Sequence, residues 1–387
     1  MTVPRGVPDG KGNRLRSLGS LTAIAHARGL DALGTVAVEA APALIRDLDM
    51  AALLGIGDLV GRAAATVELP AAPADVVPAT ERHRWIPGHW ARALAEEGLV
   101  ALDDTGRLHR VEAPRRSELT AARETISTAT AGLGYPPALA TYLLDSLRAL
   151  PALLRDEISA QSLLFRDSEP DTAEAIYRDN PVNRYLNAAA AAVVADLAND
   201  RGGLRVLELG AGTGATTADL LPALGGGSDY LFTDLSPLFL RDARERFACF
   251  PFVRFGLVDF ARSIADQCQG GHFDLVVAVN TAHNAVDVRD LLGEIAGLLG
   301  PGGALLLIET CHEHHQSLAS MPFLLSPRTG EQPVRRTDQR AGTTRTYLTG
   351  PEWCAAATGA GLRPAVELPP PAHPLAAFSQ RLSTFIR

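Results

Sequence analysis

The stretch VLELGAGTGATT, residues 206–217, combines an apolar run, an acid and three glycines at alternate positions. Glycine lets a backbone turn sharply and lets a ligand approach it closely. The helix expected to begin near Thr216 offers free N–H groups at its start, which suit a phosphate or a carboxylate. The stretch therefore predicts a strand, a ligand-binding turn formed by Gly210, Gly212 and Gly214, and a helix.

Two kinds of cofactor fit such a turn, and the acid in front of it discriminates between them. The spacing from Gly210 and Gly212 to Ala215 also satisfies the dinucleotide fingerprint, so the glycines alone leave NAD open. Glu208, at the end of the predicted strand, would lie unfavourably close to a pyrophosphate, whereas it suits the ammonium of a methionyl group. We therefore expect S-adenosylmethionine to be the cofactor.

Acids that end the next two predicted strands are expected to bind the adenosine moiety. Asp234, in LFTDLS, can accept hydrogen bonds from both ribose hydroxyls, which NAD and S-adenosylmethionine share. Asp259, in GLVDF, is placed to accept a hydrogen bond from the adenine amino group. The predicted cofactor site also includes the residues that follow these acids, Leu235 and Phe260.

The order of elements after Gly203 predicts an α/β domain. Strand-like runs (RVLELG, DYLFTD, VRFGLVD, FDLVVAVN and ALLLIET) alternate with helical runs such as VRDLLGEIAGLL. This alternation is typical of βαβ units on a parallel sheet. We expect a Rossmann-like domain over residues 166–387.

Residues 1–165 instead predict a mainly helical N-terminal domain. Apolar positions recur at helical spacing in residues 18–65, and residues 117–165 are helical in character as well. Between them, WIPGHWARALAEEGLVALDDTGRLHRVEA predicts a helix followed by two short strands around Asp104-Thr105-Gly106, a winged-helix-like end. We interpret this domain as a scaffold or substrate lid.

The overall composition excludes several classes of function. A formal net charge of −8 argues against nucleic-acid binding, which needs a basic face. No segment has the roughly 18 uncharged apolar residues of a membrane span, and the N-terminus lacks the apolar core of a signal peptide. The four cysteines form no CxxC pair, which indicates a reduced, cytoplasmic setting.

Five motifs together resemble class I S-adenosylmethionine-dependent methyltransferases, and among these the C-methyltransferase domains of polyketide synthases and related nonribosomal peptide synthetases. The motifs are YRDNPVNRYLN (177–187), VLELGAGTGATT, YLFTDLSPLFLRDARERF (230–247), FDLVVAVNTAHNAVDV (273–288) and LLGPGGALLLIET (298–310). The resemblance implies a mostly parallel seven-stranded sheet. It also implies that Tyr177 contacts the cofactor.

Two residues at neighbouring strand ends are candidates for proton transfer. His283 follows the strand-like run DLVVAVN, and Glu309 ends LLLIE, so both should lie at the edge of the sheet where ligands bind. A histidine beside a carboxylate can act as an oriented general base. In the family resembled, a His and a Glu at these motif positions are the catalytic dyad. The alternative is that His283 caps a helix and Glu309 makes a salt bridge.

The expected reaction is methyl transfer to carbon in a polyketide, peptide or related natural-product intermediate. His283 would remove a proton from a carbon between two carbonyls, as in a β-ketoacyl thioester, and Asn280 would bind the cofactor or a substrate carbonyl. Unlike the synthase domains that it resembles, the chain is expected to be a free-standing enzyme, and the acceptor is either tethered to an acyl or peptidyl carrier protein or a small free metabolite. The alternatives are O- or N-methylation of a small aromatic metabolite, a cofactor-binding regulator without catalysis, and an NAD-dependent oxidoreductase.

Two loops near the C-terminal end carry further polar residues. CHEHH (311–315) contains metal-capable side chains, but three histidines on one loop rarely supply four fixed ligands, so we expect no metal. We interpret it as a substrate-facing loop. SPRTGEQPVRRTDQRAGTTR (326–345) is expected to form a mobile lid whose arginines meet a carboxylate or a phosphate, or else a solvated loop.

Overall fold

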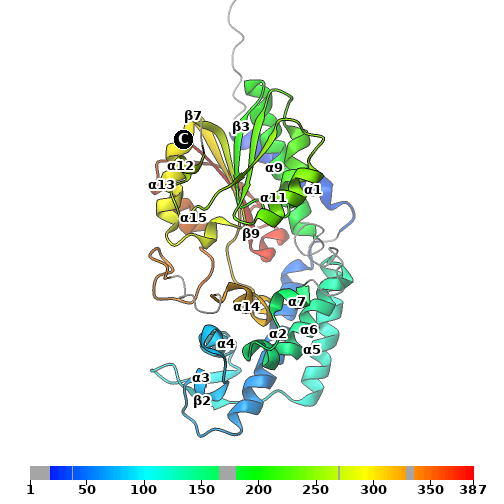
Figure 1. Cartoon of the computed structure of the whole chain (residues 1–387). Coiled ribbons are helices and arrows are strands. Elements are labelled where there is room, and N and C mark those ends of the chain that lie inside the picture. The colour runs from blue at the N-terminus through cyan, green and yellow to red at the C-terminus, as the bar shows by residue number, and fades with distance from the viewer. Residues whose placement is uncertain (1–17, 37, 165–179, 269–270, 328–334) are drawn as a thin grey trace, which may run out of the picture.

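A seven-stranded sheet forms the upper part of the molecule in a computed structural model that describes residues 18–36, 38–164, 180–268, 271–327 and 335–387 (Figure 1). The strand order is β5-β4-β3-β6-β7-β9-β8, and β9 alone runs opposite to the other six strands. The mostly parallel seven-stranded sheet is therefore confirmed. Its strands are β3 (Arg205–Leu209), β4 (Asp229–Asp234), β5 (Val253–Leu257), β6 (Phe273–Val279), β7 (Leu299–Thr310), β8 (Arg363–Leu368) and β9 (Gln380–Ile386).

Helices cover both faces of the sheet, which explains why its strands are almost continuously apolar. Alternate residues of β3 enter different cores: Val206 packs in one, and Leu207 and Leu209 pack in the other. The first face is covered by α1 (Leu18–Leu33), α9 (Pro181–Arg201), α10 (Ala215–Leu220) and α11 (Pro237–Arg246). The second face is covered by α12 (Ile264–Gln267), α13 (Val288–Leu298) and α15 (Gly350–Gly359).

Local signals set the bounds of α9, the longest of these covering helices. The Asn180 side chain accepts a hydrogen bond from the Asn183 amide at 2.8 Å, and Pro181 occupies the first helical position. Gly202 ends the helix in a left-handed conformation, with φ of 73°.

The lower part of the molecule is helical and has a separate apolar core built around Trp90. The predicted helix followed by two short strands is confirmed as α4 with the antiparallel pair β1 and β2, joined by a turn in which Asp103 accepts hydrogen bonds from the Thr105 and Arg107 amides. Its elements are α2 (Ala41–Ala64), α3 (Pro73–Val76), α4 (Ile86–Glu96), β1 (Val100–Leu102), β2 (Leu108–Val111), α5 (Arg116–Gly132), α6 (Pro137–Leu154) and α7 (Ala160–Leu164).

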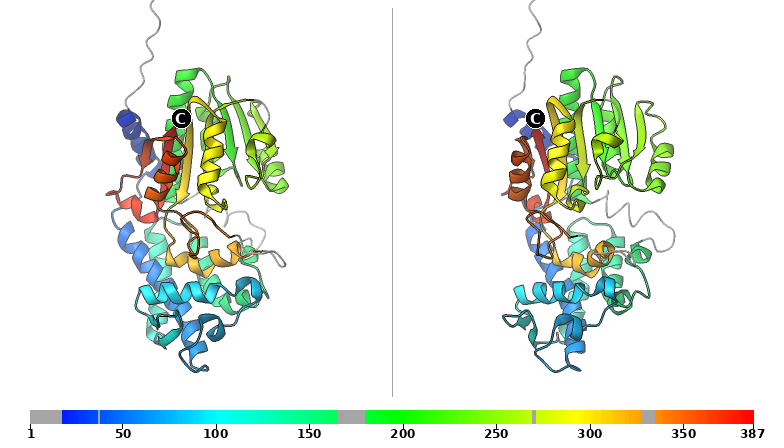
Figure 2. Two further views of the ribbon diagram at one scale, coloured as in Figure 1. Left: turned by 90° about the vertical axis from the view of Figure 1, so that its left-hand side faces the viewer. Right: turned by 60° about the vertical axis from the view of Figure 1, so that its left-hand side comes forward.

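Chain segments cross between the two parts in both directions, as the side views show (Figure 2). Helix α1 packs on α9 of the sheet part, where Gly29 leaves room for the Tyr185 ring. In return, η5 (His315–Ala319) and α14 (Met321–Leu325) enter the lower core, and the Trp90 indole donates a hydrogen bond to the Leu318 carbonyl at 3.0 Å. The predicted boundary at residue 165 lies in residues 165–179, outside the described residues, and stays a prediction.

Two further observations concern membrane-spanning helices and the state of the cysteines. Among the described residues, no helix combines the length and the apolar character that a membrane crossing requires. All four cysteines, Cys249, Cys268, Cys311 and Cys354, carry free thiols.

Candidate active site

The glycine turn after β3 has the backbone conformation that its sequence predicts. Gly210, Gly212 and Gly214 have φ values of 61°, 57° and 72°, in the left-handed region. A Cβ on Gly210 would overlap the Thr281 side chain, and one on Gly214 would lie 2.7 Å from the Phe247 ring. A Cβ on Gly212 would meet nothing within 4 Å. Packing therefore explains two of the glycines, and the third borders open space, which suits the close approach of a ligand.

Replacing Gly212 by alanine tests whether that space holds a ligand. The added methyl group meets no protein atom, so we expect the fold to survive, with a backbone cost of about 1–2 kcal/mol from the positive φ. Binding of S-adenosylmethionine, measured by calorimetric titration, is expected to weaken at least ~10-fold. Gly214→Ala is the control for thermal unfolding, because its methyl group would collide with Phe247. Wild-type affinity in Gly212→Ala would place the ligand elsewhere.

The Asp234 carboxylate closes this turn from the end of β4. One of its oxygens accepts a hydrogen bond from the Gly212 amide and the other from the Ser236 amide, each at 2.8 Å. Leu235 follows with 62% of its surface exposed, and Leu257, which is opposite Asp234 in the sheet register, is 53% exposed. The acid thus lies beside an apolar surface at the edge of the sheet.

Glu208 is fully buried, and its observed contacts are with the protein. Its Oε2 accepts hydrogen bonds from the Thr217 hydroxyl at 2.7 Å and from the Tyr230 hydroxyl at 2.8 Å. Burial raises the pKa of Glu208 to about 7. These contacts tie β3 to α10 and β4, and so support the turn; the predicted contact with an ammonium group stays a prediction.

The other predicted cofactor residues lie at neighbouring strand ends. Asp259 accepts a hydrogen bond from the Ala261 amide at 2.9 Å, while Phe260 is partly buried against the second core. Asn280 directly follows β6 with a φ of 46°, and its Oδ1 accepts hydrogen bonds from the amide and the hydroxyl of Thr310. Tyr177 lies outside the described residues.

His283 and Glu309 meet at the carboxyl edge of the sheet. His283 lies in the short 3-10 turn η4 (Ala282–Asn284) after β6, and its Nδ1 is 2.7 Å from Glu309 Oε2. Glu309 Oε1 accepts hydrogen bonds from the Thr281 and Ala282 amides at 3.0 and 2.7 Å. Because Nδ1 donates to the carboxylate, Nε2 is left as the ring nitrogen that can take up a proton. The arrangement has the chemistry of an oriented general base.

A cavity of about 220 Å³ lies between the sheet and the helical part, and its lining includes Thr310, the residue after Glu309. It is lined by Tyr135, Tyr142, Thr310, His312 and Tyr347, among others. The Tyr347 ring also contacts the His283 ring edge-on, with centroids 5.0 Å apart. The cavity is therefore separated from the imidazole of His283 by the Tyr347 side chain, which belongs to its lining. Its aromatic side chains come from Tyr135 before α6, Tyr142 within α6, Tyr347 and Phe378, and no periodic signal in the sequence connects these positions.

The CHEHH loop joins the sheet part to the helical part. His314 pairs with Asp49 of α2 at 3.0 Å, and Glu313 pairs with His89 of α4 at 2.8 Å. Among the described residues, no three His, Cys, Asp or Glu side chains group in a way that could hold a metal ion. His312 lines the cavity, and burial lowers the pKa of its imidazole.

The predicted lid, residues 326–345, is described only in part. Residues 328–334 are outside the described residues; within residues 335–345, which are largely exposed, Asp338 and Arg340 form a buried ion pair at 2.6 Å. Arg345 pairs with Glu352 at 2.9 Å. Arg336, Arg340 and Arg345 therefore contact the protein itself, a role that the sequence did not reveal.

Comparisons with known proteins agree with this geometry. A family model described as a methyltransferase domain matches residues 207–305. Pyochelin synthetase PchF of Pseudomonas aeruginosa is 34% identical over 250 residues, covering 62% of this chain and 14% of the synthetase. Polyketide synthase ThaG of Burkholderia thailandensis is 40% identical over 174 residues, covering 42% of this chain and 3% of the synthase. The chain thus spans a small fraction of these relatives.

Solved structures establish the fold over nearly the whole chain. The CurJ carbon methyltransferase superposes with a TM-score of 0.78 at 19% identity, covering 96% of this chain and 99% of that one. The trans-methyltransferase CalH, solved as a complex with SAH, gives a TM-score of 0.62 at 19% identity and covers 88% of this chain and 90% of that one. The chain therefore has the class I methyltransferase fold, and it resembles the C-methyltransferase domains of polyketide synthases and nonribosomal peptide synthetases.

Proposed function

We propose that the protein transfers a methyl group from S-adenosylmethionine to carbon in a polyketide, peptide or related natural-product intermediate. The observation that carries this proposal is the buried His283–Glu309 pair at the carboxyl edge of the sheet, whose neighbours Thr310 and Tyr347 line a cavity. An activated carbon acid needs a base to form the enolate that accepts the methyl group, and this pair supplies one.

The methyl donor would lie along the strand ends that begin with the glycine turn. In this proposal Gly212 borders the donor, Asp234 accepts hydrogen bonds from its ribose, and Leu235 covers its adenine ring. Asp259, Phe260 and the other predicted cofactor residues complete the site. The donor, when bound, supplies an electrophilic methyl group. CalH is bound to SAH in its solved structure, which supports the same donor here.

Proton transfer is assigned to the histidine and the carboxylate acting together. His283 Nε2 removes the acidic proton, and Glu309 stabilises the imidazolium that forms while holding the ring in place. The enolate carbon then attacks the methyl group, and SAH leaves. Hydroxyl deprotonation by the same histidine would instead give O-methylation, so NMR of the product decides which atom receives the methyl group.

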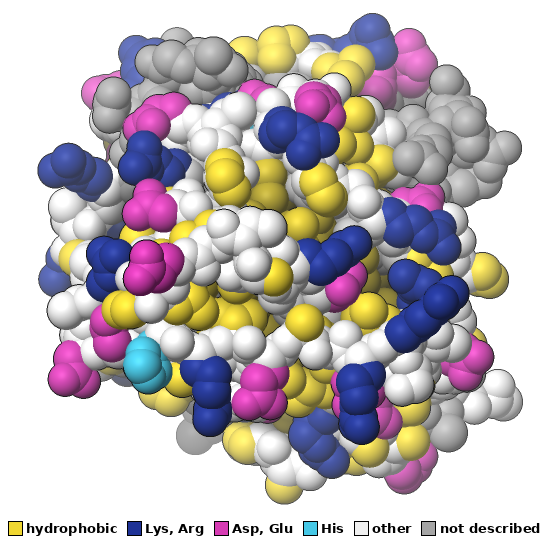
Figure 3. Space-filling model, turned by 90° about the horizontal axis from the view of Figure 1, so that it is seen from below, with side chains coloured by type: hydrophobic (Ala, Val, Ile, Leu, Met, Phe, Trp, Pro, Cys, Tyr) yellow, Lys and Arg dark blue, Asp and Glu magenta, His cyan; other side chains and the backbone are white. Residues whose placement is uncertain are grey.

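The proposed acceptor is an acyl or peptidyl group carried by a carrier protein. PchF and ThaG are a synthetase and a polyketide synthase, which supports a tethered acceptor over a free metabolite. We also retain the cytoplasmic location as a proposal. A nucleic-acid partner finds no support on the underside of the helical part, where basic and acidic side chains are interspersed (Figure 3).

Titration of S-adenosylmethionine and SAH into wild type and Asp234→Ala tests the donor site first. We expect the substitution to weaken binding by ~2 kcal/mol, about 30-fold, because it removes charge-assisted hydrogen bonds to the ribose. Asp229→Ala is the matched control. Asp229 begins the same strand, at the end away from the proposed donor site, and pairs there with Arg254. Absence of binding to the wild type would overturn the proposed function.

A further inference from the structure

The turn that carries His283 is held by a carboxylate on one side and by two guanidinium groups on the other. Glu309 accepts hydrogen bonds from two amides that precede the histidine. Two arginines donate hydrogen bonds to carbonyls of the same turn: Arg336 and Arg340 each bind the carbonyls of His283 and Ala285. The amides before His283 therefore meet a carboxylate, and the carbonyls that follow meet guanidinium groups.

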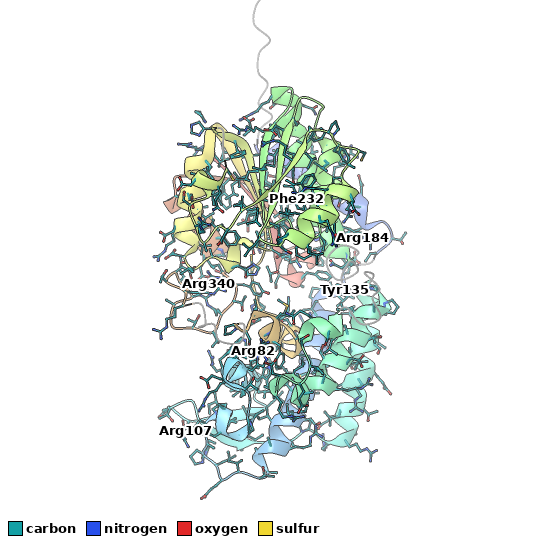
Figure 4. The ribbon with its side chains drawn as sticks, viewed as in Figure 1. Arg82, Arg107, Tyr135, Arg184, Phe232 and Arg340 are labelled. Carbon is teal, nitrogen blue, oxygen red and sulfur yellow. The ribbon has the colours of Figure 1, made fainter. Side chains whose placement is uncertain are left out.

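Arg340 is the more completely buried of the two arginines. Its side chain and that of Asp338 are both 0% exposed, and the two are joined by paired hydrogen bonds. Asp338 also accepts a hydrogen bond from the Val288 amide at the start of α13. Arg340 lies at the level where the sheet and the helical part meet (Figure 4).

A buried ion pair of this kind is weak evidence for stability, because desolvation of both charges offsets their attraction. The fork of a guanidinium group, by contrast, fixes the direction of several acceptors at once. Arg340 uses its fork on Asp338 and on the carbonyls of His283, Ala285 and Thr346. The next residue after Thr346 is Tyr347, whose ring contacts the imidazole of His283. These contacts constrain both the backbone and the ring of the histidine.

We propose that Arg340 is a positioning residue that fixes the base for methyl transfer, through the carbonyl groups of the turn 283–285. Arg336 supports the same carbonyls from a less buried position. Burial and the neighbouring Arg340 lower the pKa of Arg336 to about 10, so it keeps its charge at neutral pH. This inference rests on the proposed function, because it assigns a role in orienting His283.

The test compares Arg340→Met and Arg340→Lys with Arg345→Met, a control on the same segment that pairs with Glu352. Methyl-transfer kcat, the acceptor KM, thermal unfolding and donor affinity are measured for each. We expect Arg340→Met to lower kcat by about 10- to 100-fold, since a displacement of about 1 Å can cost that much. Donor affinity should stay within about twofold of wild type, Arg340→Lys should recover part of kcat, and Arg345→Met should resemble wild type.

Arg336→Gln keeps the inference testable should Arg340→Met fail to fold, because Arg336 lies outside the buried ion pair. We expect it to lower kcat by less than Arg340→Met, also without loss of donor affinity. Wild-type kcat in Arg336→Gln and in any folded Arg340 variant would overturn the inference, while the activity of the wild type tests the proposed function separately.

A spectroscopic readout does not depend on turnover. The ¹⁵N signals of the His283 ring are expected to move in Arg340→Lys and Arg336→Gln and to stay in place in Arg345→Met. Unchanged signals in the first two variants would overturn the positioning role even if no acceptor is methylated.

Discussion

Alanine in place of His283 is expected to lower methyl transfer by about 10²- to 10⁴-fold, the contribution typical of a positioned general base. The imidazole is the group of this pair that can take up a proton, because its Nδ1 is held 2.7 Å from Glu309. Donor affinity should change little, since the predicted donor contacts lie at other strand ends. The measurement is single-turnover methyl transfer to a β-ketoacyl thioester, together with calorimetric titration of S-adenosylmethionine.

A histidine at the opposite end of the same strand provides the control. His272 is exposed and precedes β6, so His272→Ala should leave both rate and affinity unchanged. Wild-type turnover in His283→Ala would remove the histidine from the mechanism. Loss of donor binding in that variant would assign it to the cofactor site instead.

Glutamine in place of Glu309 is expected to lower kcat by about 10²-fold or more, because an amide cannot stabilise the imidazolium as a carboxylate does. Glu309 is 1% exposed and accepts hydrogen bonds from the histidine ring and from two backbone amides. Glutamine retains the size and one acceptor oxygen, so the fold should persist. The melting temperature and kcat are to be measured on the same preparation.

The double variant His283→Ala/Glu309→Gln shows whether the two residues act as a unit. Residues that work together give strongly non-additive losses, so the double variant should be about as slow as His283→Ala alone. Glu367→Gln on β8 is the matched control. It makes the same chemical change at an exposed carboxylate, which pairs with Arg381, and should leave kcat unchanged. Additive losses would mean that Glu309 acts independently of the histidine.

The sequence predicts the sheet and its functional edge because both depend on local patterns. Apolar runs with glycine turns mark the parallel strands, and each strand end places the next residue at one common edge. Asp234, His283 and Glu309 were found in this way, and the structure places them at strand ends at that edge. The short hairpin after α4 was likewise visible from a helix followed by a turn sequence.

The remaining contacts could not be predicted, because they join residues that are distant in the chain. The hydrogen bonds of Arg340 to His283 and Ala285 span more than 50 positions and follow no period. The pairing of Asp49 with His314 depends on how α2 packs under the sheet. For Glu208, the sequence predicted the position at the strand end. It did not predict the hydrogen bonds that its carboxylate accepts from Thr217 and Tyr230, which lie on α10 and β4.

The packing of α1 on α9 decides which residues a graft of this fold into another protein must include. Helix α1 precedes the helical part in the chain, yet it covers the alanine-rich face of a helix that supports the sheet. A graft beginning at residue 166 would leave that face uncovered and invite self-association. The transferable piece therefore includes α1 from residue 18 onward, and the helical part travels with it as an insertion between two helices that cover the same face of the sheet.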